Sequence, residues 1–159
     1  MLIIFDLDGT LYDRAGQVPD NYTEQDLQQL KPFPGVKEFL QSFSGTKILV
    51  TKETDPGLQD KKINALGIRP YFHSIYICHT DEEKKKSFQE IQQQFPGEEL
   101  VVVGDRIDLE VKFGKELGLK TVWMRQGKHR DRRPQEYWEV PDYEISEFSE
   151  LAEVLPSPP

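Results

Sequence analysis

Residues 2–11 read LIIFDLDGTL, and this stretch decides the fold. The apolar run Leu2–Phe5 stops at two acids, which is typical of a strand buried on both faces of a parallel sheet. Asp6 and Asp8 then follow at the carboxyl end of that strand, where open α/β folds bind ligands, and their spacing places both on one side of an extended chain. Two carboxylates held so close require a cation, a proton or a ligand between them. The stretch therefore predicts a functional site; the alternative is a solvated acidic turn.

Strand and helix patterns alternate along the rest of the chain. Buried-strand patterns are found at residues 47–51, 74–78, 100–103 and 120–124, and residues 143–145 are a candidate for a short edge strand. Helical patterns cover residues 23–30, 36–43, 55–66, 81–95, 109–117 and 148–154. The alternation predicts an α/β fold, namely a Rossmann-like parallel sheet of about five strands flanked by helices. We expect a single domain over residues 1–159, with a frayed tail at 155–159.

The composition restricts the compartment and the partners. The one cysteine, Cys78, cannot form an internal disulfide, so a reducing cytoplasm is expected. No apolar stretch approaches the roughly 20 residues that span a bilayer, and the amino terminus lacks the basic flank of a signal peptide, so no membrane partner is expected. The formal net charge of −8 argues against nucleic acid as a partner, because a polyanion gains affinity by meeting Lys and Arg.

Polar residues also end other predicted strands at the same edge of the sheet. Thr51 ends the second strand, and Asp105 follows the fourth. Taken alone, each is an ordinary strand-end or turn residue. Their shared position with Asp6 and Asp8 at the carboxyl ends of neighbouring strands favours a common site.

Two segments resemble motifs of the haloacid dehalogenase superfamily, whose commonest members are magnesium-dependent phosphatases. They read FDLDGTLYD at residues 5–13 and GDRIDLEVKFGKELGLKTVWM at residues 104–124. Counterparts of all four family motifs span residues 1 to about 125. The resemblance implies that Asp6 is the nucleophile, that Asp8 is the general acid and base, and that Thr51 binds the phosphate.

The implied reaction brings a carboxylate to a dianionic phosphoryl group, and the two repel each other unless a cation bridges them. Mg²⁺ prefers oxygen ligands and keeps several waters, which suits a sparse set made by the Asp6 and Asp105 side chains and the backbone carbonyl of Asp8. Asp6 would form an aspartyl-phosphate. Asp8 would protonate the leaving oxygen and then activate water, a role that requires a raised pKa beside the other acids. Thr51 and a lysine would bind the phosphoryl oxygens.

Two family positions are ambiguous in this sequence. The phosphate-binding lysine falls within Lys84, Lys85 and Lys86, and the spacing to the apolar Phe88 favours Lys84. The final acid of the fourth motif is represented by Glu110, five residues after the metal aspartate, whereas Asp108 is a competing candidate at three residues. These two acids are expected in the outer shell of the metal.

The segment 12–31 is too short to bury a core of its own, so we expect a loop or minimal cap and an open active site. Open members of the family tend to act on large substrates or to borrow a lid from a neighbouring subunit. The sequence therefore allows either a phosphorylated small molecule or a larger phosphorylated substrate, and it allows a homo-oligomer. The basic stretch RQGKHRDRR at residues 125–133 follows the fifth strand and emerges on the same side. Lys52, Lys128 and Arg130 are therefore candidate substrate contacts; the alternative for the stretch is a solvated loop.

These expectations favour a magnesium-dependent phosphomonoester hydrolase. Dehalogenation on the same scaffold needs only the nucleophile, so the presence of Asp8 argues against it. A phosphotransferase needs a cap that shields the intermediate from water, which this chain is expected to lack. A non-catalytic binding protein of the same fold is the alternative from another class, and the complete set of motifs argues against it.

Overall fold

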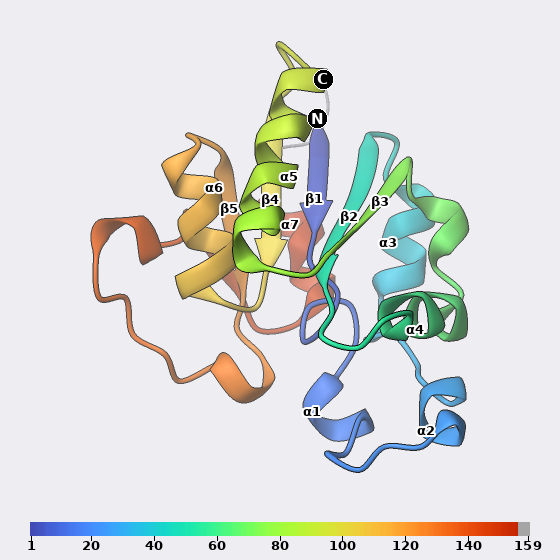
Figure 1. Ribbon diagram of the computed structural model, residues 1–159. Helices are drawn as coiled ribbons and strands as arrows, with labels where there is room; N and C mark the ends of the chain where they lie inside the picture. The colour runs from blue at the N-terminus through green and yellow to red at the C-terminus, as the bar shows by residue number, and fades with distance from the viewer. Residues whose placement is uncertain (156–159) are drawn as a thin grey trace.

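Six parallel strands form one sheet in the computed structural model of the protein, which describes residues 1–155 (Figure 1). The strands are β1 (Leu2–Phe5), β2 (Thr46–Lys52), β3 (Ser74–Cys78), β4 (Leu100–Gly104), β5 (Lys120–Met124) and β6 (Tyr143–Ile145). Their order across the sheet is β3-β2-β1-β4-β5-β6. The predicted α/β fold is confirmed. The sheet has six strands rather than about five, because residues 143–145 pair with β5 as a parallel edge strand.

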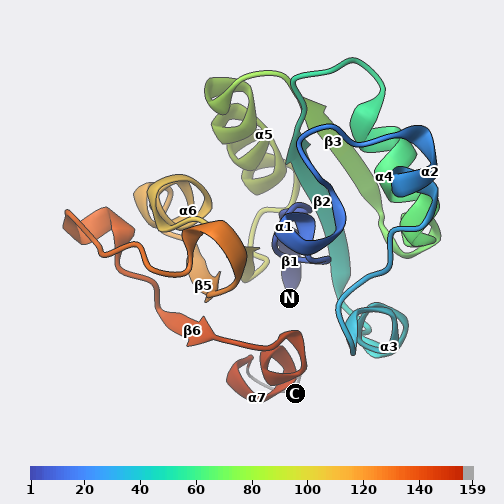
Figure 2. The same ribbon diagram turned by 90° about the horizontal axis from the view of Figure 1, so that it is seen from below.

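Helices cover both faces of the sheet, as Figure 2 shows in a view onto the carboxyl ends of the strands. They are α1 (Arg14–Gln17), α2 (Glu24–Gln28), α3 (Val36–Ser42), α4 (Leu58–Leu66), α5 (Asp81–Gln94), α6 (Lys112–Glu116) and α7 (Leu151–Val154). Side chains of β1 alternate between the two cores: Ile3 and Phe5 pack with α3, α4 and α7, whereas Leu2 and Ile4 pack with α5 and α6. This two-sided burial explains why the strand is continuously apolar.

Several helix boundaries differ from the sequence-based expectation, most clearly at two helices. The helix expected from residue 55 begins at Leu58, because Gly57 adopts φ +79°, a left-handed conformation that glycine tolerates and that interrupts a right-handed helix. The helix expected over 109–117 is divided into a π-helical turn, η2 (Ile107–Val111), and the short α6. A π turn shifts the phase of the side chains that follow it.

The segment between β1 and β2 carries three helices and, within the described residues, no larger inserted helical bundle. Thr23 caps α2 in a reciprocal capping box with Asp26. Leu155, at the start of the expected tail, is buried against the core, and residues 156–159 of that tail lie outside the described part. None of the helices in residues 1–155 has the length and apolar character needed to cross a bilayer.

The strand order places β1 beside β4 at the point where the chain reverses its direction across the sheet. The chain first proceeds from β1 through β2 to β3, and then returns to the other side of β1 to form β4. Loops that leave two such neighbouring strands in opposite directions open a crevice between them. Asp6 and Asp105 are the first residues after these two strands.

Candidate active site

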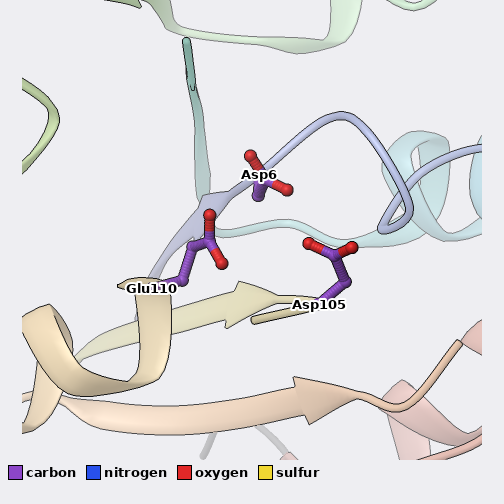
Figure 3. A group of neighbouring side chains, drawn as sticks. All are labelled: Asp6, Asp105 and Glu110. Carbon is purple, nitrogen blue, oxygen red and sulfur yellow. The ribbon is translucent and has the colours of Figure 1, made fainter. Parts of the chain in front are cut away.

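Three buried carboxylates converge at this crevice (Figure 3). Asp6 follows β1, Asp105 follows β4, and Glu110 projects from η2. One oxygen from each side chain lies within 4.8 Å of one oxygen from each of the others. All three residues are at most 7% exposed. This group is named the acidic cluster below.

Glu110 reaches the acidic cluster because Gly104 has no side chain. A Cβ atom placed on Gly104 would lie 2.5 Å from the Cβ of Glu110 and 2.9 Å from its Oε2 atom. The backbone N–H of Arg106 donates to Oε2 of Glu110 at 3.1 Å and keeps the side chain folded back over the loop. The glycine and the π turn thus bring the fifth residue after Asp105 back to the strand end.

Lys84 lies between two members of the acidic cluster. Its Nζ atom is 2.7 Å from Oδ1 of Asp6 and 2.7 Å from Oε1 of Glu110, and its side chain is 2% exposed. The neighbouring lysines point elsewhere: Lys85 pairs with Glu116, and Lys86 is exposed. The structure therefore places Lys84, and neither of the other two, at the candidate site.

The electrostatics of the acidic cluster favour a bound cation. Burial and the nearby Glu110 raise the pKa of Asp6, although Lys84 opposes this shift. Burial, Asp6 and Glu110 likewise raise the pKa of Asp105. Burial alone would lower the pKa of Lys84, but Asp6 and Glu110 reverse that effect and raise it. With all three carboxyl groups ionised, the cluster would carry a surplus of negative charge over the one ammonium group, and carboxylate oxygens are the hard ligands that Mg²⁺ prefers. The residues present therefore fit Mg²⁺.

Asp8 is bound by residues that were not among the predicted site residues. Its Oδ1 atom accepts from Nζ of Lys62 at 2.8 Å and from the hydroxyl of Tyr12, and its Oδ2 atom accepts from Nε2 of Gln59 at 2.9 Å. Burial raises the pKa of Asp8, but the charge and hydrogen bond of Lys62, with the bonds from Tyr12 and Gln59, outweigh burial and lower it. The expectation of a raised pKa for Asp8 is therefore wrong in this arrangement.

Thr51 is fully buried and is linked to Asp8 through Gln59. The Nε2 group of Gln59 donates to Oγ1 of Thr51 at 2.6 Å as well as to Asp8, while its Oε1 atom is buried and has no partner within the described residues. The sequence did contain a signal for this link. The buried stripe of α4 is made of Gln59, Lys62, Ile63 and Leu66, so two polar residues occupy the core-facing positions of a helix.

Asp108 does not join the acidic cluster. Both of its carboxylate oxygens accept from the guanidinium of Arg106, at 3.1 and 2.9 Å, and Arg132 lies 3.0 Å from Oδ2. Burial opposes ionisation of Asp108, but these two arginines prevail and lower its pKa. Of the two acids left open by the sequence, the structure brings Glu110 to Asp6 and Asp105, and gives Asp108 two cationic partners instead.

A cavity of about 410 Å³ opens onto the acidic cluster. Two of the three predicted substrate residues line this cavity. Lys52 and Lys128 line the cavity, and Lys52 is paired with Asp81 at 2.6 Å. Arg130 does not line it; the Arg130 side chain is 66% exposed and lies 3.8 Å from Asp131. The structure thus brings Lys52 and Lys128 to this cavity but not Arg130.

The buried pair of Lys62 and Asp8 leads to a stability prediction. We expect Lys62→Met to lower the free energy of unfolding at pH 7 by about 1–3 kcal/mol, because Asp8 would lose its cationic partner while remaining mostly buried. The pKa of Asp8 is lowered on folding, so the pair stabilises the fold above the ordinary value of 3.8, and this contribution is lost as the pH falls through the folded value. Urea unfolding of both proteins at pH 7 and pH 3 measures the difference.

Lys61→Met is the matched control for this prediction. Lys61 is the preceding residue of the same helix, but its partner Glu24 and its own side chain are exposed at 67% and 53%. Exposed pairs contribute little, so this variant should stay within about 0.5 kcal/mol of wild type. Equal losses in the two variants, or a Lys62→Met loss that is the same at pH 3, would contradict a stabilising role for the buried pair.

Comparison with known proteins places this architecture among described families. A family model for haloacid dehalogenase-like hydrolase matches residues 21–118. The glyceraldehyde 3-phosphate phosphatase of Methanopyrus kandleri is 31% identical over 141 residues, which cover 84% of this chain and 60% of that protein. The enzyme of the same name from Pyrococcus furiosus is 30% identical, with 84% and 58% covered. The chain thus spans about three fifths of the length of these curated relatives.

Solved structures share the fold at low sequence identity. The HAD-hydrolase YfnB from Bacillus subtilis bound to magnesium aligns with a TM-score of 0.72 and 18% identity over 96% of this chain and 97% of that chain. The L-2-haloacid dehalogenase from Xanthobacter autotrophicus aligns with a TM-score of 0.68 and 13% identity over 96% of each chain. Since the family model covers more than half of the sequence, the chain belongs to the haloacid dehalogenase-like hydrolases.

Proposed function

We propose that this protein is a magnesium-dependent phosphomonoester hydrolase that acts through an aspartyl-phosphate at Asp6. The observation that carries the proposal is the convergence of four side chains at the crevice between β1 and β4, with Asp8 two residues from the first of them. These side chains are Asp6, Asp105, Glu110 and Lys84. The names of the glyceraldehyde 3-phosphate phosphatases support the same reaction class. Their greater length leaves the substrate of this chain to be determined.

The acidic cluster would hold Mg²⁺ through the side chains of Asp6 and Asp105, with the backbone carbonyl of Asp8 as a further oxygen and Glu110 as the supporting acid. The bound ion would reduce the repulsion between the attacking carboxylate and the phosphoryl group. Lys84 keeps the Asp6 carboxylate oriented and supplies a positive charge where negative charge develops on the phosphoryl oxygens. Thr51 offers a hydroxyl whose present partner is Gln59.

The chemistry proceeds in two displacements. An Asp6 oxygen attacks phosphorus, the bond from phosphorus to the ester oxygen breaks, and the leaving oxygen takes a proton from Asp8. This step requires the protonated form of Asp8, which the donors around its carboxyl group disfavour. Water then attacks the aspartyl-phosphate, gives a proton to Asp8 and releases inorganic phosphate, which restores Asp6. The donors around Asp8 favour its carboxylate, the form that removes the proton from water.

Steady-state hydrolysis of p-nitrophenyl phosphate tests the proposal. We expect release of p-nitrophenol that requires Mg²⁺, stops when EDTA is in excess, and returns when Mg²⁺ is restored. Halide release from 2-chloropropionate, measured in parallel, should stay at the background rate. Release of halide without phosphatase activity would support dehalogenation instead, and inactivity in both assays would support a non-catalytic binding protein.

A further inference from the structure

One wall of the active-site cavity is built by two segments that are far apart in the sequence. One is α1 and the other is η3 (Gly127–His129), the turn after β5, and the two contact each other. A Cβ atom placed on Gly127 would lie 4.0 Å from the Cβ of Ala15. Figure 2 shows α1 in front of the carboxyl end of β1. A leaving group attached to a phosphate at Asp6 would therefore meet α1 and η3.

Besides Lys84, four cationic side chains line this cavity, and they differ in how far nearby carboxylates neutralise them. Lys52 is paired with Asp81 at 2.6 Å, and Arg106 is paired with Asp108 at 2.9 Å. Within residues 1–155, Lys128 has no carboxylate within 4.0 Å, and Arg14 reaches only Asp8, at 4.0 Å. Lys128 and Arg14 thus present positive charge to the cavity without a close counter-charge. Their position is notable in a chain whose formal net charge is −8.

His129 extends the polar surface of the same wall without adding charge. Burial and the nearby Arg106 and Arg132 lower its pKa to about 4, so the ring is neutral at pH 7. The Nε–H of Arg132 donates to Nδ1 of His129 at 3.0 Å. The positive charge of this wall that lacks a close counter-charge therefore comes from Lys128 and Arg14, and Asp13, the N-cap of α1, adds one carboxylate to the same wall. Charges of one sign beside a cavity raise the local concentration of an oppositely charged ligand.

We propose that Lys128 and Arg14 form a subsite for a second anionic group on the substrate. The preferred substrates are then phosphomonoesters whose leaving group carries a carboxylate or a second phosphate. This inference rests on the proposed phosphatase function and specifies its substrate class. The phosphate ester binds at the acidic cluster, and the second anion binds at the wall made by α1 and η3.

Matched substrates and a matched variant test the subsite. The substrates are alkyl phosphates of two to five carbons, the ω-carboxyalkyl phosphates of the same lengths and the corresponding α,ω-bisphosphates, each with Mg²⁺ at low ionic strength. The measured quantity is the ratio of kcat/KM for the anionic chain to kcat/KM for the neutral chain of equal length. Arg130→Ala is the control, since Arg130 carries the same charge two residues from Lys128 but does not line the cavity.

We expect a ratio above one for wild type at one or more chain lengths, decreasing as salt is added. Lys128→Ala and Arg14→Ala should each lower that ratio by about three- to tenfold, as an exposed ionic contact allows, and Arg130→Ala should leave it unchanged. The carboxylate and bisphosphate arms show which anion is preferred.

A wild-type ratio near one at every length would overturn the subsite, as would equal effects of Lys128→Ala and Arg130→Ala. Both results require measurable hydrolysis of the neutral alkyl phosphates. They are thus distinct from failure of the proposed function, in which wild type with Mg²⁺ hydrolyses none of the phosphomonoesters and the subsite is rejected with it.

Discussion

Asp6→Asn is expected to lower kcat for p-nitrophenyl phosphate by a factor on the order of 10³ or more, because an amide of nearly the same shape cannot attack phosphorus. The fold should survive the change. Burial and Glu110 raise the pKa of Asp6, so the folded state disfavours its ionised form, and a neutral side chain relieves that repulsion. Turnover and the thermal midpoint of the metal-free protein measure the two effects separately.

Asp13→Asn is the matched control for the nucleophile. Asp13 lines the same cavity, and its side chain accepts the N–H of Gly16 at the start of α1, a capping role that asparagine also fills. We expect this variant to change kcat by less than about threefold, as a surface change outside the acidic cluster should. Activity of Asp6→Asn above a few per cent of wild type would reject Asp6 as the nucleophile.

Binding of Mg²⁺ is expected to stabilise the protein, and this stabilisation should depend on Asp105. Mg²⁺ at about 100 times its dissociation constant should stabilise wild type by about 2.7 kcal/mol, or roughly 5–10 °C for a chain of this size. Asp105→Asn should raise the thermal midpoint without metal, since it removes one of three buried carboxylates, and should abolish the shift on adding Mg²⁺. Differential scanning fluorimetry with EDTA and with Mg²⁺ measures both quantities without recourse to activity.

Asp108→Asn provides the comparison for Asp105→Asn. Asp108 is only three residues further along the chain, but its oxygens are bound by Arg106 and Arg132. The Asp108 variant should therefore keep the Mg²⁺ shift and lose stability in both conditions. A Mg²⁺ shift retained in Asp105→Asn and lost in Asp108→Asn would place the metal elsewhere.

The sequence by itself determined the strands and the edge at which the site lies. Burial on both faces imposes a continuous apolar run, so β1 and β4 were recognisable from a few adjacent residues. The parallel arrangement then brings the residues after these strands to one edge. The proximity of Asp6 and Asp105 was therefore predictable without knowledge of any long-range contact.

The tertiary structure alone decided which helical and loop residues reach that edge. The phase of α5 selects Lys84 from three adjacent lysines, and the π turn with Gly104 selects Glu110 rather than Asp108. The packing of α4 directs Lys62 onto Asp8 and reverses the expected shift of the Asp8 pKa. These outcomes depend on helix phase and on one-residue changes in register, which rotate a side chain by about 100° and are set by packing between distant segments.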